Sequence, residues 1–224
     1  MHISIIIPIL NEAEVLVGHL KSLQAARDEG HEVIVVDGGS TDGSQALAKP
    51  YADQLLVAKC GRAQQMNAGA GVASGDILLF LHIDTLLPDD GLSEIVQAGT
   101  TNANTWGRFD VRLSGNKRFF RVIESMMNWR SRMTGIATGD QAIFVSRNLF
   151  HRLHGFADIP LMEDVEISRR LKKIGPPICL TQRVITSSRR WEVGGTLKTI
   201  FLMWRLRLAY WLGADPALLV RHYR

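Results

Sequence analysis

The sequence predicts an α/β fold in which a mostly parallel central sheet is flanked by helices. Apolar runs typical of buried strands alternate with longer helical segments through the first half of the chain. The expected strands are Ile3–Ile9, Glu32–Val36, Leu55–Ala58 and Ile77–Leu81. The expected helices between them are Glu12–Arg27, Ser44–Lys49 and Ala63–Ala73. Such alternation implies parallel strands joined by right-handed crossovers.

The second half of the chain is less regular. We expect strands at Thr105–Leu113, Ala142–Val145, Ile178–Thr181 and Val184–Ser187, and helices at Lys117–Met133, Glu163–Ile174 and Thr196–Leu212. We find no internal repeat and no linker, and 224 residues suffice for one domain with a full core. We therefore expect one body over residues 1–195 and a basic helical tail over residues 196–224.

Charge is unevenly distributed along the chain. The net charge is +4, but residues 183–224 hold eight Lys and Arg against Glu192 and Asp215. Residues 1–182 therefore carry a net charge of −2. A basic tail on a nearly neutral body favours contact with anions, either lipid head groups or substrate phosphates. Aromatic residues are only 7% and no RNA-binding motif is present, which argues against nucleic acid as a partner.

The cysteines and the N-terminus bear on cellular location. Cys60 and Cys179 are far apart, so we expect free thiols in a reducing compartment rather than a disulfide framework or a zinc site. The chain opens directly on a strand-like run, so we expect no signal peptide. No run of about 18 uncharged apolar residues is present, so we expect no membrane-spanning helix.

Polar side chains follow two of the expected strands at the points where they end. Asp37 follows strand 32–36 and precedes Gly38 and Gly39, whereas His82 and Asp84 follow strand 77–81. Ligands of open α/β sheets bind outside the carboxyl ends of the strands. A carboxylate there, with a histidine two residues before it, can face a divalent cation and a phosphate. The alternative for Asp84 is that it caps the next helix.

Five segments, in order, resemble motifs of the family 2 glycosyltransferases, nucleotide-sugar-dependent enzymes of the compact, Rossmann-like GT-A type. They are Pro8-Ile9-Leu10-Asn11-Glu12, Val35-Val36-Asp37-Gly38-Gly39-Ser40-Thr41-Asp42-Gly43, Leu81-His82-Ile83-Asp84-Thr85, Glu163-Asp164 and Arg190-Trp191. The stretch Gly61–Ala70 is also similar to a bacterial subgroup described as radical-SAM/selenodomain-associated transferases. A Walker loop and a Gly-x-Gly-x-x-Gly turn after the first strand are both absent from the sequence.

The resemblance assigns nucleotide binding to residues 1–100 and acceptor binding to residues 101–195. It implies that Asp37 contacts the base, that two glycines let the backbone approach a flat ligand, and that Arg62 reaches the diphosphate. The nucleotide-binding set that follows from it is Pro8, Asn11, Glu12, Asp37, Gly38, Gly39, Arg62, His82 and Asp84. Gln65 and Asn67 would line the pocket wall. For Asp37 and Asp42 the alternative is a role as turn and cap residues.

The resemblance also implies a divalent cation, Mg²⁺ or Mn²⁺. The family's metal motif is usually Asp-x-Asp, and this chain has His82 at its first position and Asp84 at its second. Asp84 with phosphate oxygens and waters is an adequate shell for Mg²⁺. His82 would either ligate Mn²⁺, since imidazole suits transition metals, or donate a hydrogen bond to phosphate.

The remaining motifs concern catalysis and the acceptor. The acidic pair implies Asp164 as the general base and Glu163 as a residue that shapes the acceptor site; the alternative is that both carboxylates simply favour a helix start. Asp140 is expected to contact the sugar or the acceptor. Arg190 would stabilise the diphosphate, with Arg189 as its competitor, and Trp191 would pack beneath the acceptor.

These assignments predict a metal-assisted, inverting transfer of one sugar from a nucleoside-diphosphate sugar, a UDP-sugar by preference, to an acceptor hydroxyl. The family's longer Gln-x-x-Arg-Trp motif lacks its Gln here, because position 187 is Ser187, which favours a non-processive reaction. The expectation requires that Asp37, Asp84 and Asp164 converge around one cleft. The alternatives are a nucleotide-sugar-binding protein without turnover and a nucleotidyltransferase, although the latter usually carries a basic Gly-rich loop after the first strand.

The tail segment 196–212 leaves three interpretations open. It is a helix packed on the domain, a subunit interface, or an interfacial membrane helix whose Trp204, Tyr210 and Trp211 suit a head-group boundary. The membrane interpretation predicts a cytoplasmic enzyme attached to the inner membrane face, near a lipid-linked acceptor. A homodimer through Lys117–Met133 or the tail is a further alternative. The sequence alone does not identify the sugar or the acceptor.

Overall fold

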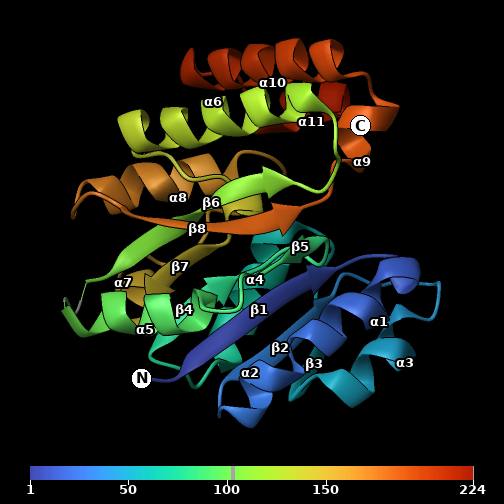
Figure 1. Ribbon diagram of the computed structural model, residues 1–224, viewed down its shortest axis with the longest axis vertical. Helices are drawn as coiled ribbons and strands as arrows, with labels where there is room; N and C mark the ends of the chain where they lie inside the picture. The colour runs from blue at the N-terminus through green and yellow to red at the C-terminus, as the bar shows by residue number, and fades with distance from the viewer. Residues whose placement is uncertain (102–103, 224) are drawn as a thin grey trace.

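The computed structural model describes residues 1–101 and 104–223 and contains an eight-stranded mixed sheet (Figure 1). The strand order is β3-β2-β1-β4-β7-β6-β8-β5. The strands are β1 (Ile3–Ile9), β2 (Glu32–Asp37), β3 (Gln54–Val57), β4 (Ile77–Phe80), β5 (Thr85–Leu86), β6 (Trp106–Leu113), β7 (Ile143–Ser146) and β8 (Ile178–Thr186). The predicted α/β architecture is confirmed.

The helices cover both faces of the sheet and form a further layer beyond β6 and β8. They are α1 (Ala13–Ser22), α2 (Gln24–Asp28), α3 (Ser44–Ala48), α4 (Arg62–Val72), α5 (Gly91–Thr101), α6 (Arg118–Thr134), α7 (Arg147–Arg152), α8 (Glu163–Lys172), α9 (Arg189–Val193), α10 (Thr196–Trp211) and α11 (Pro216–Tyr223). Two short 3₁₀ segments, Lys49–Tyr51 and Gly139–Gln141, complete the described elements. The single helix predicted over residues 12–27 is broken at Leu23, between α1 and α2.

Strands β1, β2 and β4 are largely apolar because both of their faces are covered. Strands β1, β2, β3 and β4 are mutually parallel where they pair. Alternate residues of β1, such as Ile5 and Ile7, pack with Leu16 and Leu20 of α1 on one face. Ile6 packs on the other face with residues of α4, α7 and α8. This arrangement explains why the strands read as continuous apolar runs rather than alternating ones.

The second half of the sheet is mixed. Strand β7 runs antiparallel to both β4 and β6, and β6 pairs parallel with β8. The prediction of two short strands at 178–181 and 184–187 is wrong, because β8 is one strand with an irregularity opposite Phe109 and Asp110. Two residues between Leu180 and Arg183 lie outside the pairing, and this irregularity makes the sequence look like two strands.

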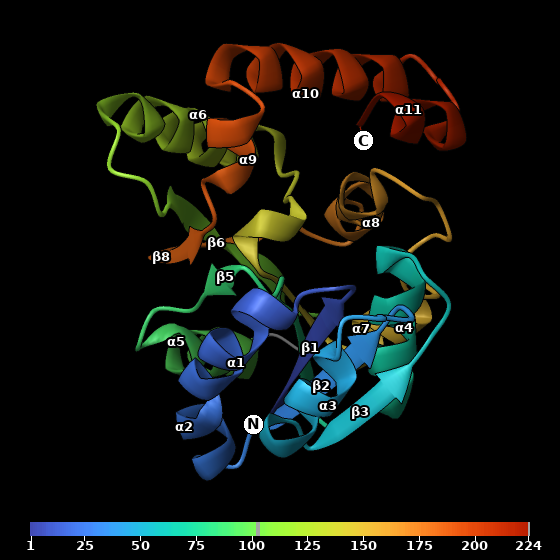
Figure 2. The ribbon, with the colours of Figure 1, turned by 90° about the vertical axis from the view of Figure 1, so that its right-hand side faces the viewer.

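The C-terminal helices pack on the rest of the chain. Leu206 of α10 and Leu219 of α11 form a buried cluster with Leu161, Met162 and Val165 at the start of α8. Figure 2 shows α10 and α11 above α8, on the side of the molecule that also carries α6. Within residues 1–101 and 104–223, no helix is long and apolar enough to cross a bilayer.

Candidate active site

The carboxyl ends of β1 and β2 are held together by a buried glutamine of α4. Gln65 donates hydrogen bonds of 2.8 Å from Nε2 to the carbonyl oxygens of both Ile9 and Val36. A Cβ placed on Gly38 would lie 3.1 Å from the Gln65 Oε1 atom, so a glycine at 38 accommodates this bridge. Asn67, expected beside Gln65 in the pocket wall, instead bonds the backbone N–H and carbonyl of Phe156.

A cavity of about 340 Å³ opens at this edge of the sheet. It brings together five of the residues expected to bind the nucleotide: Pro8, Glu12, Arg62, His82 and Asp84. Ile9, Leu10, Cys60, Gly61, Gln65 and Ile83 complete its walls. The side chains come from the ends of β1 and β4 and from the start of α4, because parallel strands bring their carboxyl ends to one edge.

Asp37 lies at the same edge, opposite Ile9 in the β1–β2 register, but its carboxylate faces its own turn. It accepts hydrogen bonds from the backbone N–H groups of Gly39 and Ser40 (both 2.9 Å), from the Ser40 hydroxyl and from Gln45 Nε2 (2.7 Å). Burial acts to raise the pKa of Asp37, and these donors outweigh it and hold the pKa below its usual value. Asp37 does not line the cavity, so its contact with a base stays a prediction.

Asn11 and Asp42 join the first loop to the second. The exposed Asn11 has a left-handed backbone (φ +54°), and its side-chain oxygen accepts a hydrogen bond of 2.9 Å from the N–H of Thr41. Asp42 accepts hydrogen bonds from the N–H groups of Ala13, the first residue of α1, and Ser44, the first residue of α3. Asp42 therefore acts as the turn and cap residue that the sequence left as an alternative.

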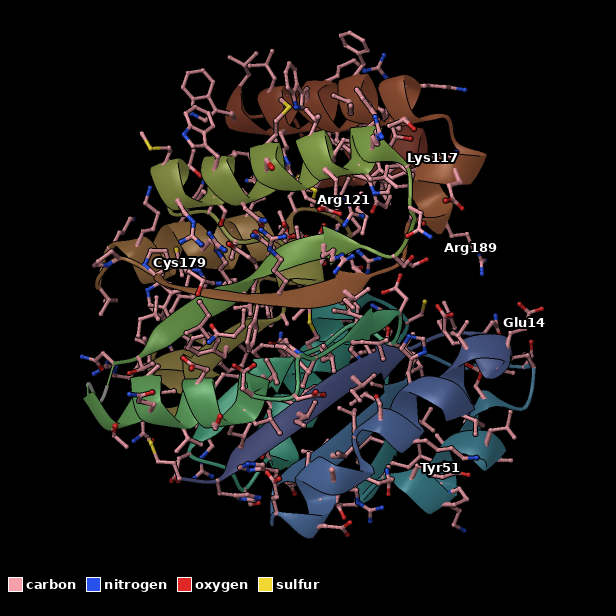
Figure 3. The ribbon with its side chains drawn as sticks, viewed as in Figure 1. Glu14, Tyr51, Lys117, Arg121, Cys179 and Arg189 are labelled. Carbon is pink, nitrogen blue, oxygen red and sulfur yellow. The ribbon has the colours of Figure 1, made fainter. Side chains whose placement is uncertain are left out.

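Opposite charges meet at the mouth of the cavity. Burial first, and then the nearby Asp84 carboxylate, raise the pKa of Glu12, while Arg189 and Arg62 oppose that rise. Arg189 projects from the start of α9, on the same side of the molecule as Glu14 of α1 (Figure 3). The structure thus places Arg189 near the nucleotide side; the side chain of Arg190 lies outside the described part of the chain.

His82 stands between this cavity and a second, smaller one. The second cavity is lined by His82, Gly139, Glu163 and Asp164 together with Met66, Phe80, Ile143 and Phe156. Burial and the Arg62 charge lower the pKa of His82 to about 3, so its imidazole is neutral at physiological pH. A Cβ on Gly139 would lie 2.6 Å from His82 Cε1 and Nε2, so only glycine allows the ring to pack here without a shift.

The acidic pair at the start of α8 has two different environments. Asp164 accepts hydrogen bonds from the N–H groups of Gly139 (2.9 Å) and Val165 (2.7 Å). Glu163 is 6% exposed, and burial together with the Asp164 charge raises the pKa of Glu163 to about 7. Glu163 is therefore partly protonated at neutral pH.

Arg62 lines the first cavity, interacts electrostatically with the acidic pair of the second, and is contacted by a residue from the C-terminal helix. Its side chain forms a hydrogen bond with Tyr223 of α11. Burial of the guanidinium acts to lower the pKa of Arg62, but Tyr223, Glu163 and Asp164 together hold it above its usual value. Sequence reasoning missed Tyr223, because nothing in a C-terminal helix indicates that it reaches the start of α4.

Asp140 and Trp191 lie apart from the nucleotide side. They line a third cavity, of about 360 Å³, between α6 and α10. The same cavity contains Arg130 and Arg207, which the sequence analysis did not identify as site residues. The sequence did not indicate a functional role for these arginines, because each lies in a helix that is otherwise rich in apolar residues.

The side chains around Asp84 fit a cation that arrives with its substrate. Among the described residues there is no group of three His, Cys, Asp or Glu side chains that could hold a metal by themselves. Asp84 and the nearby Glu12 supply carboxylate oxygens, and His82 supplies a neutral imidazole on the same cavity. Mg²⁺ commonly binds through one or two carboxylates plus substrate phosphates, so this donor set suits a cation completed by a diphosphate.

Solved structures define the class of fold. TarS of S. aureus in complex with UDP-GlcNAc matches with a TM-score of 0.66 at 18% identity, over 84% of this chain and 58% of that chain. The mannosyltransferase PcManGT from Pyrobaculum calidifontis in complex with GDP-Man and Mn²⁺ matches with a TM-score of 0.64 at 23% identity, over 92% of this chain and 60% of that chain. These matches confirm the GT-A type of fold that the sequence predicts.

The family follows from the sequence match. The model of glycosyl transferase family 2 matches residues 4–156, more than half of the chain, so the protein belongs to this family. The undecaprenyl-phosphate 4-deoxy-4-formamido-L-arabinose transferase of Serratia proteamaculans (strain 568) is 29% identical over 160 residues, and that of Yersinia pestis (strain Pestoides F) is 30% identical over 151 residues. Each match covers 62% of this chain and 46% of the relative, so the chain spans about half the length of these curated relatives.

Proposed function

We propose that this protein transfers one sugar from a nucleoside-diphosphate sugar, a UDP-sugar by preference, to an acceptor hydroxyl with inversion. The observation that supports this most is the continuity of the site. His82 lines both the cavity with Asp84 and the cavity with Asp164, and Arg62 interacts electrostatically with groups in both. A donor diphosphate beside Asp84 would therefore place its sugar close to the acidic pair.

Each side of the site has a distinct task in this reaction. A divalent cation held by Asp84, with Glu12 or His82 as further ligands, would neutralise charge on the departing diphosphate when bound. Arg62 and Arg189 would hold the phosphate oxygens. Asp164 would take the proton from the acceptor hydroxyl.

Glu163 has a role of its own in the proposal. With a pKa of about 7, it can donate a hydrogen bond to a sugar or acceptor oxygen, which an ionised carboxylate cannot do.

The solved complexes and relatives support the donor and acceptor classes. The TarS complex contains UDP-GlcNAc, the PcManGT complex contains GDP-Man and Mn²⁺, and the curated relatives are named for undecaprenyl phosphate. By analogy we propose a lipid-linked acceptor and a location on the cytoplasmic face of the inner membrane. We also propose peripheral attachment through residues 196–212, and membership of the radical-SAM-associated subgroup from Gly61–Ala70.

The test separates binding from turnover. Calorimetry with UDP and Mn²⁺ should show that Asp84→Ala weakens metal-dependent binding about tenfold or more, because a charged ligand is lost. Asp164→Asn should keep UDP binding but lose transfer about 10²- to 10⁴-fold, as expected for a general base. Asp89→Asn, at an exposed carboxylate that follows β5, is the matched control and should behave like the wild type.

Two results would reject the proposal. Transfer rates near wild type for both Asp84→Ala and Asp164→Asn would remove the assigned roles. Binding of UDP-sugars without any metal-dependent release of UDP, even over long incubation, would favour the alternative of a binding protein without turnover.

A further inference from the structure

The cavity between α6, α9 and α10 combines an apolar wall with buried cations. Its apolar lining includes Ile123, Met127, Trp191, Ile200 and Met203. Its charged lining consists of Arg130, Asp140 and Arg207. A volume of about 360 Å³ is within the size range of small-molecule sites. An interior of this kind suits a ligand that has a long apolar part and a charged end.

The two arginines have donors that no protein group satisfies. Arg130 Nε and Nη2 and Arg207 Nε are buried and have no hydrogen-bond partner in the described part of the chain. Burial and the neighbouring Arg207 charge lower the pKa of Arg130 to about 10. Unpaired buried cations are costly, and buried charges in proteins are normally paired. The missing partner therefore has the chemistry of an anion.

The cavity opens onto an apolar surface formed by α6 and α10. Met126 and Trp129 of α6 and Trp204 of α10 line it and are also exposed, Trp129 at 67% and Trp204 at 55%. The same two helices continue this exposed surface with Phe119, Val122, Met133, Phe201, Leu208 and Trp211, and Leu212 follows directly after α10. Figures 1 and 3 show α6 and α10 together at one end of the molecule, with side chains that project outward from it.

The inner end of the cavity adjoins the acidic pair. The carboxylates of Asp140 and Asp164 are close enough to Arg130 to oppose the lowering of its pKa. Asp140 follows Gly139, whose N–H donates to Asp164 at 2.9 Å. A charged group bound by the two arginines would therefore lie next to the position that the proposed function gives to the acceptor.

We propose that this cavity binds the acceptor and that the acceptor is the phosphate monoester of a long-chain isoprenoid alcohol. This inference rests on the proposed function and deepens it. The phosphate pairs with Arg130 and Arg207, and the chain lies along the apolar wall and leaves between Trp129 and Trp204 toward a lipid surface. Charge complementarity selects an anion, and the apolar exit selects one with a hydrocarbon chain. The names of the curated relatives agree with this chemistry.

The transfer step is balanced for this acceptor. A phosphate oxygen attacks the anomeric carbon and forms a new C–O bond as the bond from that carbon to the nucleoside diphosphate breaks. The nucleoside diphosphate leaves with the electron pair of that bond. The phosphate attacks as its monoanion, so its P–OH group is the acceptor hydroxyl of the proposed function, and Asp164 accepts the proton.

Binding of farnesyl phosphate, a 15-carbon probe, tests the proposal directly and needs no sugar donor. Trp129, Trp191 and Trp204 line the cavity, so their fluorescence should change on binding. Farnesol and inorganic phosphate should each bind at least tenfold more weakly, because each lacks one of the two features recognised. Arg130→Gln and Arg207→Gln should weaken farnesyl phosphate binding about 10- to 100-fold, since each removes a charged hydrogen-bond donor. Arg205→Gln, on the exposed part of α10, is the matched control and should leave binding unchanged.

Several outcomes would overturn the proposal. Equal affinity for farnesol and farnesyl phosphate would remove the role of the arginines, and equal affinity for inorganic phosphate would indicate a small-anion site. Equal losses in Arg205→Gln and Arg207→Gln would indicate non-specific charge attraction, as would equal binding to anionic vesicles without the probe. A dimer whose formation abolishes probe binding would assign the surface to a second copy of this chain.

Two measurements make the result interpretable. Thermal melting should show that Arg130→Gln is about as stable as the wild type, because relief from burial and from the Arg207 charge is offset by the lost attraction to Asp140 and Asp164. UDP binding, measured separately, distinguishes the two levels of inference. Loss of UDP binding with intact farnesyl phosphate binding would reject the proposed function alone, and the reverse would reject the acceptor assignment alone.

Discussion

Replacement of Glu163 by glutamine should stabilise the folded protein, and the gain should grow as pH rises. The Glu163 carboxyl is 6% exposed and has a pKa of about 7, against an ordinary value of 4.5. Burial is the main cause of this rise and the Asp164 charge is the second. The folded state therefore favours the protonated form, whereas the unfolded chain allows the group to ionise.

The direction and size of the effect follow from proton linkage. Between pH 4.5 and 7 the folded state binds more protons than the unfolded state, so stability falls as pH rises through this window. A difference of about 2.5 pKa units corresponds to ~3 kcal/mol of unfolding free energy. The full cost is present above pH 7, and below pH 4.5 it disappears. Glu163→Gln removes the ionisable group, so the variant does not lose unfolding free energy in this way.

Urea denaturation of the ligand-free protein from pH 5 to pH 8.5 provides the measurement. The difference in unfolding free energy between Glu163→Gln and wild type should grow by ~2 kcal/mol across this range. Glu14→Gln is the control, because Glu14 lies exposed on α1 (Figure 3) and its removal should have little effect at any pH. A difference that stays constant, or that shrinks as pH rises, would refute the argument that Glu163 is destabilised by burial.

Two further predictions concern the turn at Asp37 and the contact between Gly139 and His82. Asp37→Asn should cost ~1–3 kcal/mol at pH 7, because a buried charged acceptor of several hydrogen bonds is lost. Since the folded-state pKa of Asp37 is lowered, the ionised carboxylate stabilises the fold above its ordinary pKa of 3.8, and this stabilisation is lost as pH falls through the folded-state pKa. The stability difference between Asp37→Asn and wild type, measured by urea denaturation, should therefore shrink in acid. A difference that persists in acid would contradict the role given to the Asp37 charge. Gly139→Ala should cost ~1–3 kcal/mol and reduce transfer, because the added methyl lies 2.6 Å from the His82 ring. Gly18→Ala on α1, where the added methyl would meet no atom within 4 Å, should instead raise the unfolding free energy by ~0.5–1 kcal/mol. If chemical denaturation gives the same change in unfolding free energy for both variants, the contact with His82 is not the cause of the Gly139→Ala effect.

The sequence predicted the strands of the sheet well because their signals are local. Strand β1 has the predicted bounds, Ile3–Ile9, β2 and β4 differ from the predictions by one residue at one end, and β3 is shifted by one residue at both ends. The elements β5, α5, α7, α9 and α11 were not predicted. In β5, α7 and α9 a few residues carry too little periodicity to be recognised. The sequence also placed Asp84 and Glu12 at strand ends, and the cavity brings them together.

The site was only partly predictable, because its electrostatics depend on distant groups. The motif that contains Asp37 did not indicate that four nearby hydrogen-bond donors, from Gly39, Ser40 and Gln45, would bind its carboxylate. The neutral state of His82 requires burial and the charge of Arg62, which lies in another element. Arg190 and Trp191 were chosen from a motif, yet the structure places Arg189 by the nucleotide side and Trp191 in the cavity with Arg130.

The sequence by itself determined the class of fold, the family and the polar residues at the strand ends, since periodicity and short motifs are properties of neighbouring residues in the chain. Only the tertiary structure decided which of these residues share a cavity, that Tyr223 reaches Arg62, and that buried donor atoms of Arg130 and Arg207 in one cavity have no hydrogen-bond partner among the described residues. The physical reason is that burial, charge pairing and proton affinity are set by groups that folding brings together from far along the chain.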